Sequence, residues 1–220
     1  MAKQKVVVGG SSVTAGQLAD LFRQIQDGSI NGEYLQSVLN RPASERSGAQ
    51  PVVAIATSGV LAVDRTKPFN PTNVFGDGWS IWRGAANTNG LTGNEEQDAR
   101  SLALTAIDFA NVRFEHCLRN GEDRITGNEK LARLIASNAI RLDARLGQAL
   151  FEEEDHKTLE WLYTTRGVKW LDFFGTVLRY PRGYRCVLCF YRGGDGQWRR
   201  SANWLDHDWF VGCPSAVLAS

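Results

Sequence analysis

The chain has 220 residues, of which 43% are hydrophobic, so it is long enough to bury one sizeable core. Lysine and arginine total 25 against 24 acidic residues, and a net charge of +1 gives no long-range field that would gather phosphate backbones or anionic lipid. We therefore expect no nucleic-acid partner. The sequence has no apolar run long enough for membrane insertion and no signal-peptide core, so we expect a cytoplasmic protein by default, with display at a surface left open.

The N-terminal part has the pattern of a helical hairpin. Thr14 is placed to cap a first helix and Gln17 to reach back to it, while a second short helix is predicted from Asn31. Residues 40–50 are polar and lack periodicity, which indicates a linker. We therefore divide the chain into 1–45, a helical hairpin and linker, and 51–220, the main domain.

The first half of the main domain mixes short strands with one long helical pattern. Residues 51–63 are β-branched and suit a strand or a strand pair, and 67–93 predict an irregular region whose one short strand carries Trp79 and Trp82. A capping box at Thr126 opens a helix predicted over 127–151, and a shorter helix is predicted over 157–163. The apolar residues assigned to the inner face of the long helix are Leu131, Leu134, Ile135, Leu142, Leu146 and Leu150.

After Gly167 the pattern changes to strands and turns. Strands are predicted over 168–178 and 185–191, and a glycine-rich turn at 193–196 leads to a third strand from Trp198. Helices followed by hairpins are typical of an α+β domain, here with an antiparallel sheet near the C-terminus.

The segment 184–213 differs in composition from the rest of the chain. Seven of its thirty residues are aromatic, against 10% overall, and the chain has no lysine after Lys169 and no glutamate after Glu160. Such a composition is typical of a recognition surface. A tryptophan-rich core is the alternative, and we expect both to be partly true, with Trp198, Trp204 and Trp209 as scaffold residues.

The cysteines of this segment offer the nearest approach to reactive chemistry. Cys186 and Cys189 form a C-x2-C pair, with His207 and Cys213 further along, so a zinc- or cysteine-dependent enzyme is the rival hypothesis. However, structural zinc pairs sit on tight turns. The spacer here lies in a predicted strand, where residues three apart point to opposite faces, so we expect one cysteine to be buried and one exposed. No serine or cysteine nucleophile motif accompanies His116, His156 or His207.

The C-terminal pattern resembles a known family. It resembles the variable region of proteins diversified by diversity-generating retroelements, in the branch from uncultivated archaea and candidate-phyla bacteria. The residues that carry this resemblance are Val187-Leu188, Trp198, Trp204-Leu205, Asp208-Trp209 and the closing segment 214–218. In that family a reverse transcriptase copies a template with errors at adenines. The resemblance implies a C-type lectin-like fold for 51–220, a variable region at about 184–213, and non-enzymatic ligand binding by the diversified surface. Calcium-mediated sugar binding is not implied, because the chain lacks the Glu-Pro-Asn and Trp-Asn-Asp motifs of ordinary lectins.

The resemblance also suggests which positions vary. Errors at the adenines of asparagine codons never give Trp, Lys, Glu, Gln or Met, and every candidate position carries a residue that such errors do reach. We expect these side chains to face outward and bind an unknown protein or other macromolecular ligand, with no cofactor, no metal and an open oligomeric state. The candidate positions are Tyr184, Cys186, Cys189, Tyr191, Arg199, Ser201, Ala202, Asn203, His207, Phe210, Val211, Gly212 and Cys213.

Overall fold

A computed structural model describes residues 7–8, 11–12, 60–84 and 89–220. The chain divides into two units, Met1–Ala54 and Ile55–Ser220, which we describe separately. In the first unit, strands β1 (Val7–Val8) and β2 (Ser11–Ser12) pair antiparallel. The predicted helical hairpin, the linker and residues 51–59 of the predicted strand lie outside the described residues.

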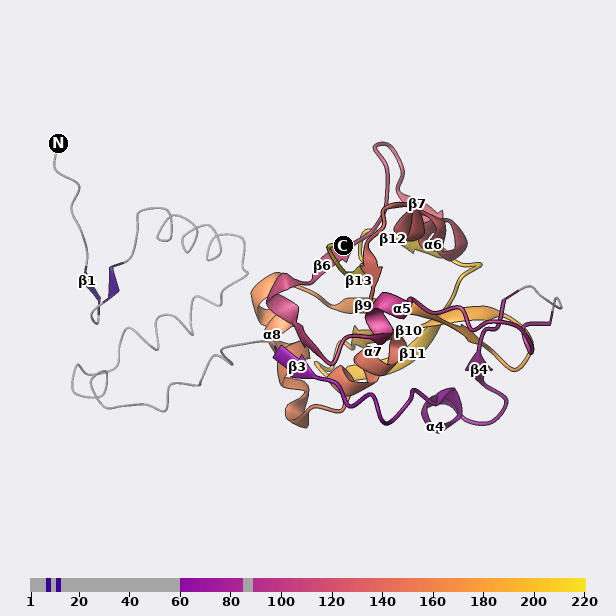
Figure 1. Ribbon diagram of the computed structural model, residues 1–220. Helices are drawn as coiled ribbons and strands as arrows, with labels where there is room; N and C mark the ends of the chain where they lie inside the picture. The colour runs from indigo at the N-terminus through magenta and orange to yellow at the C-terminus, as the bar shows by residue number, and fades with distance from the viewer. Residues whose placement is uncertain (1–6, 9–10, 13–59, 85–88) are drawn as a thin grey trace. The chain divides into compact units, whose positions relative to one another are not determined.

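The second unit alternates short strands and helices before three long strands (Figure 1). Its first elements are β3 (Val60–Ala62), α4 (Pro71–Phe75), β4 (Ser80–Ile81), α5 (Ala99–Leu102), β5 (Ala106–Asp108), β6 (Arg113–Glu115) and β7 (Arg124–Thr126). They are followed by α6 (Gly127–Ala136), β8 (Ile140–Arg141), α7 (Ala144–Phe151) and α8 (Lys157–Arg166), with 3-10 turns at Phe109–Asn111 and Glu154–His156. The last elements are β9 (Trp170–Arg179), β10 (Arg185–Arg192), β11 (Trp198–Trp204), β12 (Asp208–Phe210) and β13 (Ser215–Leu218).

The main sheet of the described residues has β9 at its centre. Strands β9, β10 and β11 form an antiparallel meander, and β11 is an edge strand. On its other side β9 pairs with β4 through its C-terminal end and with β13 through Asp172, and β13 in turn pairs with β6 and β8. Two small sheets, β12–β7 and β3–β5, stand apart from it.

A bulge in β9 ties the sheet to the start of α7. The register with β10 shifts between Val187 and Leu188, so that residues 174–176 of β9 have no partner there. Gly175 donates its N–H to the Leu142 carbonyl, and a Cβ at this position would lie 2.2 Å from the Arg141 carbonyl oxygen. Only glycine permits this approach of two backbones.

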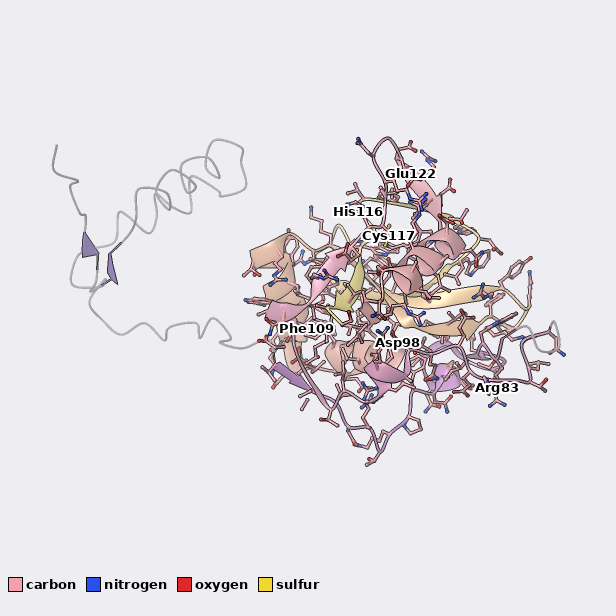
Figure 2. All side chains as sticks on the ribbon, turned by 45° about the horizontal axis from the view of Figure 1, so that its top comes forward. Arg83, Asp98, Phe109, His116, Cys117 and Glu122 are labelled. Atoms are coloured by element: carbon pink, nitrogen blue, oxygen red, sulfur yellow. The ribbon has the colours of Figure 1, made fainter. Side chains whose placement is uncertain are left out.

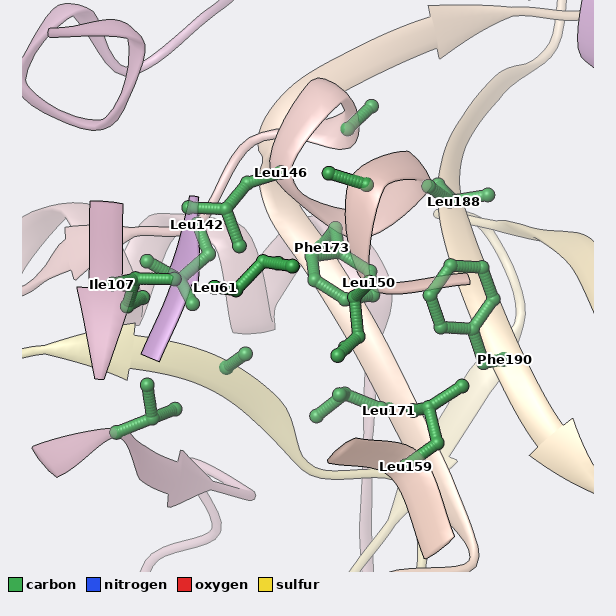
Figure 3. Packing of buried hydrophobic residues seen from close by; sticks show 14 of the residues in the cluster. Leu61, Ile107, Leu142, Leu146, Leu150, Leu159, Leu171, Phe173, Leu188 and Phe190 are labelled. Atoms are coloured by element: carbon green, nitrogen blue, oxygen red, sulfur yellow. The ribbon is translucent and has the colours of Figure 1, made fainter. Parts of the chain in front are cut away.

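The sheet is covered on both faces. One cluster packs α7 and α8 against Phe173, Leu188 and Phe190 (Figure 3). The second cluster, on the opposite face, packs α6 and the segment after β11 against Val177 and Val187. Successive residues of β10 point to opposite faces of the sheet, and each face is packed against one of the two clusters. Neighbouring residues of this strand are therefore both buried.

The predicted single helix over 127–151 is wrong. Helix α6 ends at Ala136 with Ser137 as its C-cap, and Asn138 adopts a left-handed conformation with φ of 57°. The chain then enters β8 before Asp143 caps α7. The inner residues of the two halves face different clusters, since Leu131 and Leu134 lie in the second and Leu142, Leu146 and Leu150 in the first. Ile135, predicted to face inward, is 54% exposed.

Other expectations are met. The α+β class and the C-terminal antiparallel meander are confirmed, as is the helix after 157. Thr126 caps α6, its hydroxyl accepting the Glu129 N–H at 3.2 Å. Helix α4 was not predicted, although Asn70 caps it and Pro71 occupies its first turn, two signals typical of a helix start.

Candidate functional site

Five of the candidate positions share one face of the β10–β11 hairpin, and all of them except buried Cys189 are exposed or half-buried. Register pairs Cys189 with Ser201 and Tyr191 with Arg199, and Asn203 follows two residues further along β11. Side chains alternate along a strand, so Tyr191, Arg199, Ser201 and Asn203 lie on the same side as Cys189. Arg199 is exposed, and the other three are half-buried.

The loop after β11 alternates buried anchors with exposed residues. Leu205, Trp209 and Cys213 are buried in the second cluster, on the same sheet face as Val187. Between them Phe210 is 54% and Val211 66% exposed, and Gly212 is also exposed. The chain emerges from the core at these positions, on the side that carries the exposed strand residues.

We call these two groups together the candidate binding face. It consists of Tyr191, Arg199, Ser201, Asn203, Phe210, Val211 and Gly212.

Backbone pairing and a buried ion pair hold the loop in place. Strand β12 pairs with β7, and the N–H groups of Gly127 and Asn128, at the start of α6, donate to the carbonyls of His207 and Leu205. The ammonium of Lys130, fully buried, donates to the carbonyl of Cys213 and lies 3.9 Å from a carboxylate oxygen of Asp172. The exposed residues are thus mounted on a fixed backbone.

Lys130 and Asp172 lie in an environment that disfavours charge. Burial raises the pKa of Asp172 to about 7, although Lys130 and the Trp170 indole N–H, 2.8 Å away, favour the carboxylate. Burial likewise lowers the pKa of Lys130, against the attraction of Asp172. The rings of Phe174 and Trp209 flank the ammonium at 5.3 and 4.9 Å.

The three cysteines proposed as variable positions do not face outward. Cys186 packs in the first cluster, Cys213 packs in the second, and Cys189 is buried opposite Asp172. Cys186 and Cys189 do lie on opposite strand faces, but the expectation that one of them is exposed is wrong, because both faces are covered. Burial raises the pKa of Cys186 to about 12 and that of Cys213 to about 11, and it raises the pKa of Cys189 further.

The remaining candidate positions lie on a different surface. Ala202 packs against the first cluster, on the opposite side of β11 from Ser201. The ring of Tyr184 stacks on Trp204 at 5.3 Å, and the ring of His207 lies 4.9 Å from Trp204 on the same aromatic cluster. The expectation of one continuous outward face is therefore wrong: the exposed positions form two surfaces, because even-numbered and odd-numbered residues of β11 face opposite ways.

The residues that the structure describes give no support to the metal-dependent form of the rival enzyme hypothesis. Within 60–84 and 89–220, no three His, Cys, Asp or Glu side chains are grouped so as to hold a metal ion. His116 and Cys117 are neighbours on a loop beside α6 (Figure 2), where the His116 ring accepts the N–H of Leu118 and Arg133 donates to the carbonyl of Cys117. Thiols with raised pKa values are poor nucleophiles at neutral pH.

Trp170, Asp172 and Lys130 were not predicted from the sequence as parts of the site. Trp170 stacks on Tyr191 at 5.6 Å and so borders the candidate binding face. Lys130 stands four residues before Leu134, on the apolar side of the α6 pattern, and a lysine in that place is a signal of a buried charge with a partner.

No family model, curated protein or solved structure matches the chain. None of the helices that the structure describes combines the length and the apolar character needed to cross a membrane.

Proposed function

We propose that the chain is a non-enzymatic ligand-binding protein with a C-type lectin-like fold, whose candidate binding face is diversified by adenine-directed mutagenesis. One observation carries the proposal: in β11 and the following loop, exposed and half-buried residues lie between buried anchors that belong to the core, namely Trp198, Leu205, Trp209 and Cys213. Exposed substitutions usually change stability by less than about 0.5 kcal/mol, whereas truncating a core tryptophan costs roughly 3–5 kcal/mol. The face therefore tolerates changes of residue without unfolding.

The side chains of this face suit contact with a macromolecule. Phe210 and Val211 present apolar area, while Tyr191 is held by its stack on Trp170 and loses little entropy on binding. The charge of Arg199 is already matched by Asp195. Such a surface has no strong field and fits a protein or other large partner better than a polyanion.

We restrict the proposed set of variable positions on the ground of burial. Random residues at Cys186, Cys189 or Cys213 would have to fit a packed interior, where added volume costs about 1–3 kcal/mol. We assign these three positions to the framework and keep the exposed and half-buried ones as variable.

The test is genomic, followed by a biochemical one. A near-copy of the DNA encoding 184–213, beside a reverse transcriptase gene and differing only at adenines, is the expected finding. The differences should affect codons of the candidate binding face and spare those of Trp198 and Trp209. A locus without such a copy, or differences that fall on the buried anchors, contradicts the proposal.

The rival function is tested on the purified chain. Zinc bound at one equivalent per chain, lost on substitution of Cys189 and Cys213 by serine, favours the enzyme. Metal below one tenth of an equivalent favours the binder.

A further inference from the structure

A pair of adjoining cavities lies away from the candidate binding face. The first, of about 340 Å³, is lined by Phe69, Ile81 and Leu102 together with polar residues, and the second has a volume of about 560 Å³. Phe69 and Ile81 belong to the first cluster, on the opposite side of the sheet from Ser201. Volumes of this size are typical of small-molecule sites.

Lys67, Pro68 and Arg145 line both cavities and therefore mark the boundary between them. The Arg145 side chain is nine-tenths buried: its Nε donates to the Asp64 carbonyl at 3.3 Å and its Nη1 to Glu152 at 3.2 Å. Its Nη2 makes no hydrogen bond with any residue that the structure describes. Nη2 is not one of the fully buried side-chain atoms that lack a partner, so it reaches solvent and its donors are open to an acceptor in the cavity.

Lys67 supplies a second available cation. It is exposed, and its ammonium lies 3.4 Å from Asp64, an exposed pair of small energetic weight. The lysine thus keeps donors for a ligand at the cavity boundary.

The anionic side chains around the cavities already have partners. Both oxygens of Asp143 accept from Arg65, at 2.9 and 3.0 Å, while Glu95 pairs with Arg83 and Glu152 with Arg145. The groups at the cavities that still have hydrogen bonds to make are therefore donors, and they require a ligand that accepts. Because three carboxylates stand nearby, a singly charged ligand is favoured over a dianion such as phosphate.

We propose that these cavities bind a small amphipathic carboxylate, with its carboxyl group at Arg145 and Lys67 and its apolar body in the 340 Å³ cavity. The apolar body lies against Phe69, Ile81 and Leu102, where it replaces water on apolar surface. The carboxylate accepts from Arg145 Nη2 and from the Lys67 ammonium, a charge-assisted arrangement. This site is independent of the proposed function, since none of its residues lies on the candidate binding face.

The experiment compares three six-carbon probes of equal length but different head group. Hexanoate, hexanol and hexylamine are titrated into the full chain by calorimetry at neutral pH. Hexanoate is expected to bind about tenfold or more tightly than hexanol, the difference that one charge-assisted hydrogen bond makes, and hexylamine is expected not to bind. Equal binding of hexanoate and hexanol, preference for hexylamine, or no binding of hexanoate overturns the proposal.

Two variants locate the site. Arg145→Gln removes the unused donor, and Leu102→Glu, at a partly exposed position, places a carboxylate beside the apolar body. Each is expected to weaken hexanoate binding about tenfold or more, while Arg182→Gln, the same change of charge at an exposed turn, leaves it unchanged. If Arg145→Gln fails to fold, Leu102→Glu still decides: unchanged affinity in a folded Leu102→Glu variant places the probe elsewhere and refutes the site.

Discussion

Trp209 and Phe210 are neighbours on β12, the first buried and the second exposed. They offer the sharpest test of the arrangement in which buried anchors separate the exposed residues. Trp209 is 1% exposed, and its ring meets Phe174 edge-on at 5.0 Å beside the Lys130 ammonium. Phe210 is more than half exposed. We predict that alanine at 209 destabilises the fold severely and that alanine at 210 hardly affects it.

The magnitudes follow from burial. Truncating a buried tryptophan removes its transfer free energy and leaves a cavity, for a total cost of roughly 3–5 kcal/mol. The edge-to-face contact with Phe174 contributes about 0.5–1.5 kcal/mol of that loss. Phe210→Ala removes a side chain that is mostly in water, and its effect stays within about 0.5 kcal/mol. Against a typical total stability of about 5–15 kcal/mol, the Trp209→Ala chain is weakened but still measurable.

The assay is urea unfolding followed by far-ultraviolet circular dichroism, which does not depend on the tryptophan that is removed. The free energy of unfolding is compared among the wild type and the two variants, with unchanged slopes as the control for two-state behaviour. Similar losses of unfolding free energy in both variants, or a larger loss for Phe210→Ala, would refute the assignment of Trp209 to the buried anchors and of Phe210 to the candidate binding face.

Two further predictions concern buried groups. The three buried cysteines should resist an aromatic disulfide reagent in the native chain and react once urea unfolds it, whereas half-buried Cys117 should react first. Mass spectrometry of the labelled peptides gives the order of reaction. Early labelling of any buried thiol contradicts the packing. Asp172 should make stability depend on pH, because its folded pKa of about 7 lies above the unfolded value of about 3.9. The folded state then holds this proton more tightly, so the contribution is complete below about pH 4 and is lost as pH rises to about 7. As pH rises over that range, the unfolding free energy of Asp172→Asn should increase relative to that of the wild type, by at most about 1.4 kcal/mol per pH unit. A difference between the two proteins that does not change with pH contradicts this prediction.

Local signals in the sequence were sufficient where the structure depends on neighbours along the chain. The capping box at Thr126 and the strand at 185–191 were predicted because each depends on a short stretch of sequence. A cap needs residues three positions apart, and a strand shows side chains that alternate between its two faces. The helix over 127–151 was predicted wrongly for a related reason. Its apolar spacing continues across Asn138, and only the pairing of β8 with the distant β13 shows that the chain is extended there.

Burial of the candidate site could not be read from local patterns. Whether Cys186 and Cys189 are covered depends on α7 on one side of the sheet and on the loop after β11 on the other. Composition alone treats every residue of 184–213 alike, so it could not separate the two surfaces that β11 divides. The alternation along β11 was available in the sequence, and applying it strictly would have placed Ala202 and Ser201 on opposite faces.

The position of β11 at the sheet edge predicts that substitutions are tolerated there and not one strand further in. An edge strand has a neighbour on one side only, so a larger side chain at Ser201 can turn away from the sheet, whereas Cys189, directly opposite on β10, is enclosed by β9 and β11. We predict that Ser201→Tyr changes the free energy of unfolding by less than about 0.5 kcal/mol and that Cys189→Tyr lowers it by about 1–3 kcal/mol or more. The two variants add the same ring at paired positions, and urea unfolding compares them directly. Equal costs would mean that the edge provides no room for a larger side chain, which would contradict the proposal that this face is diversified.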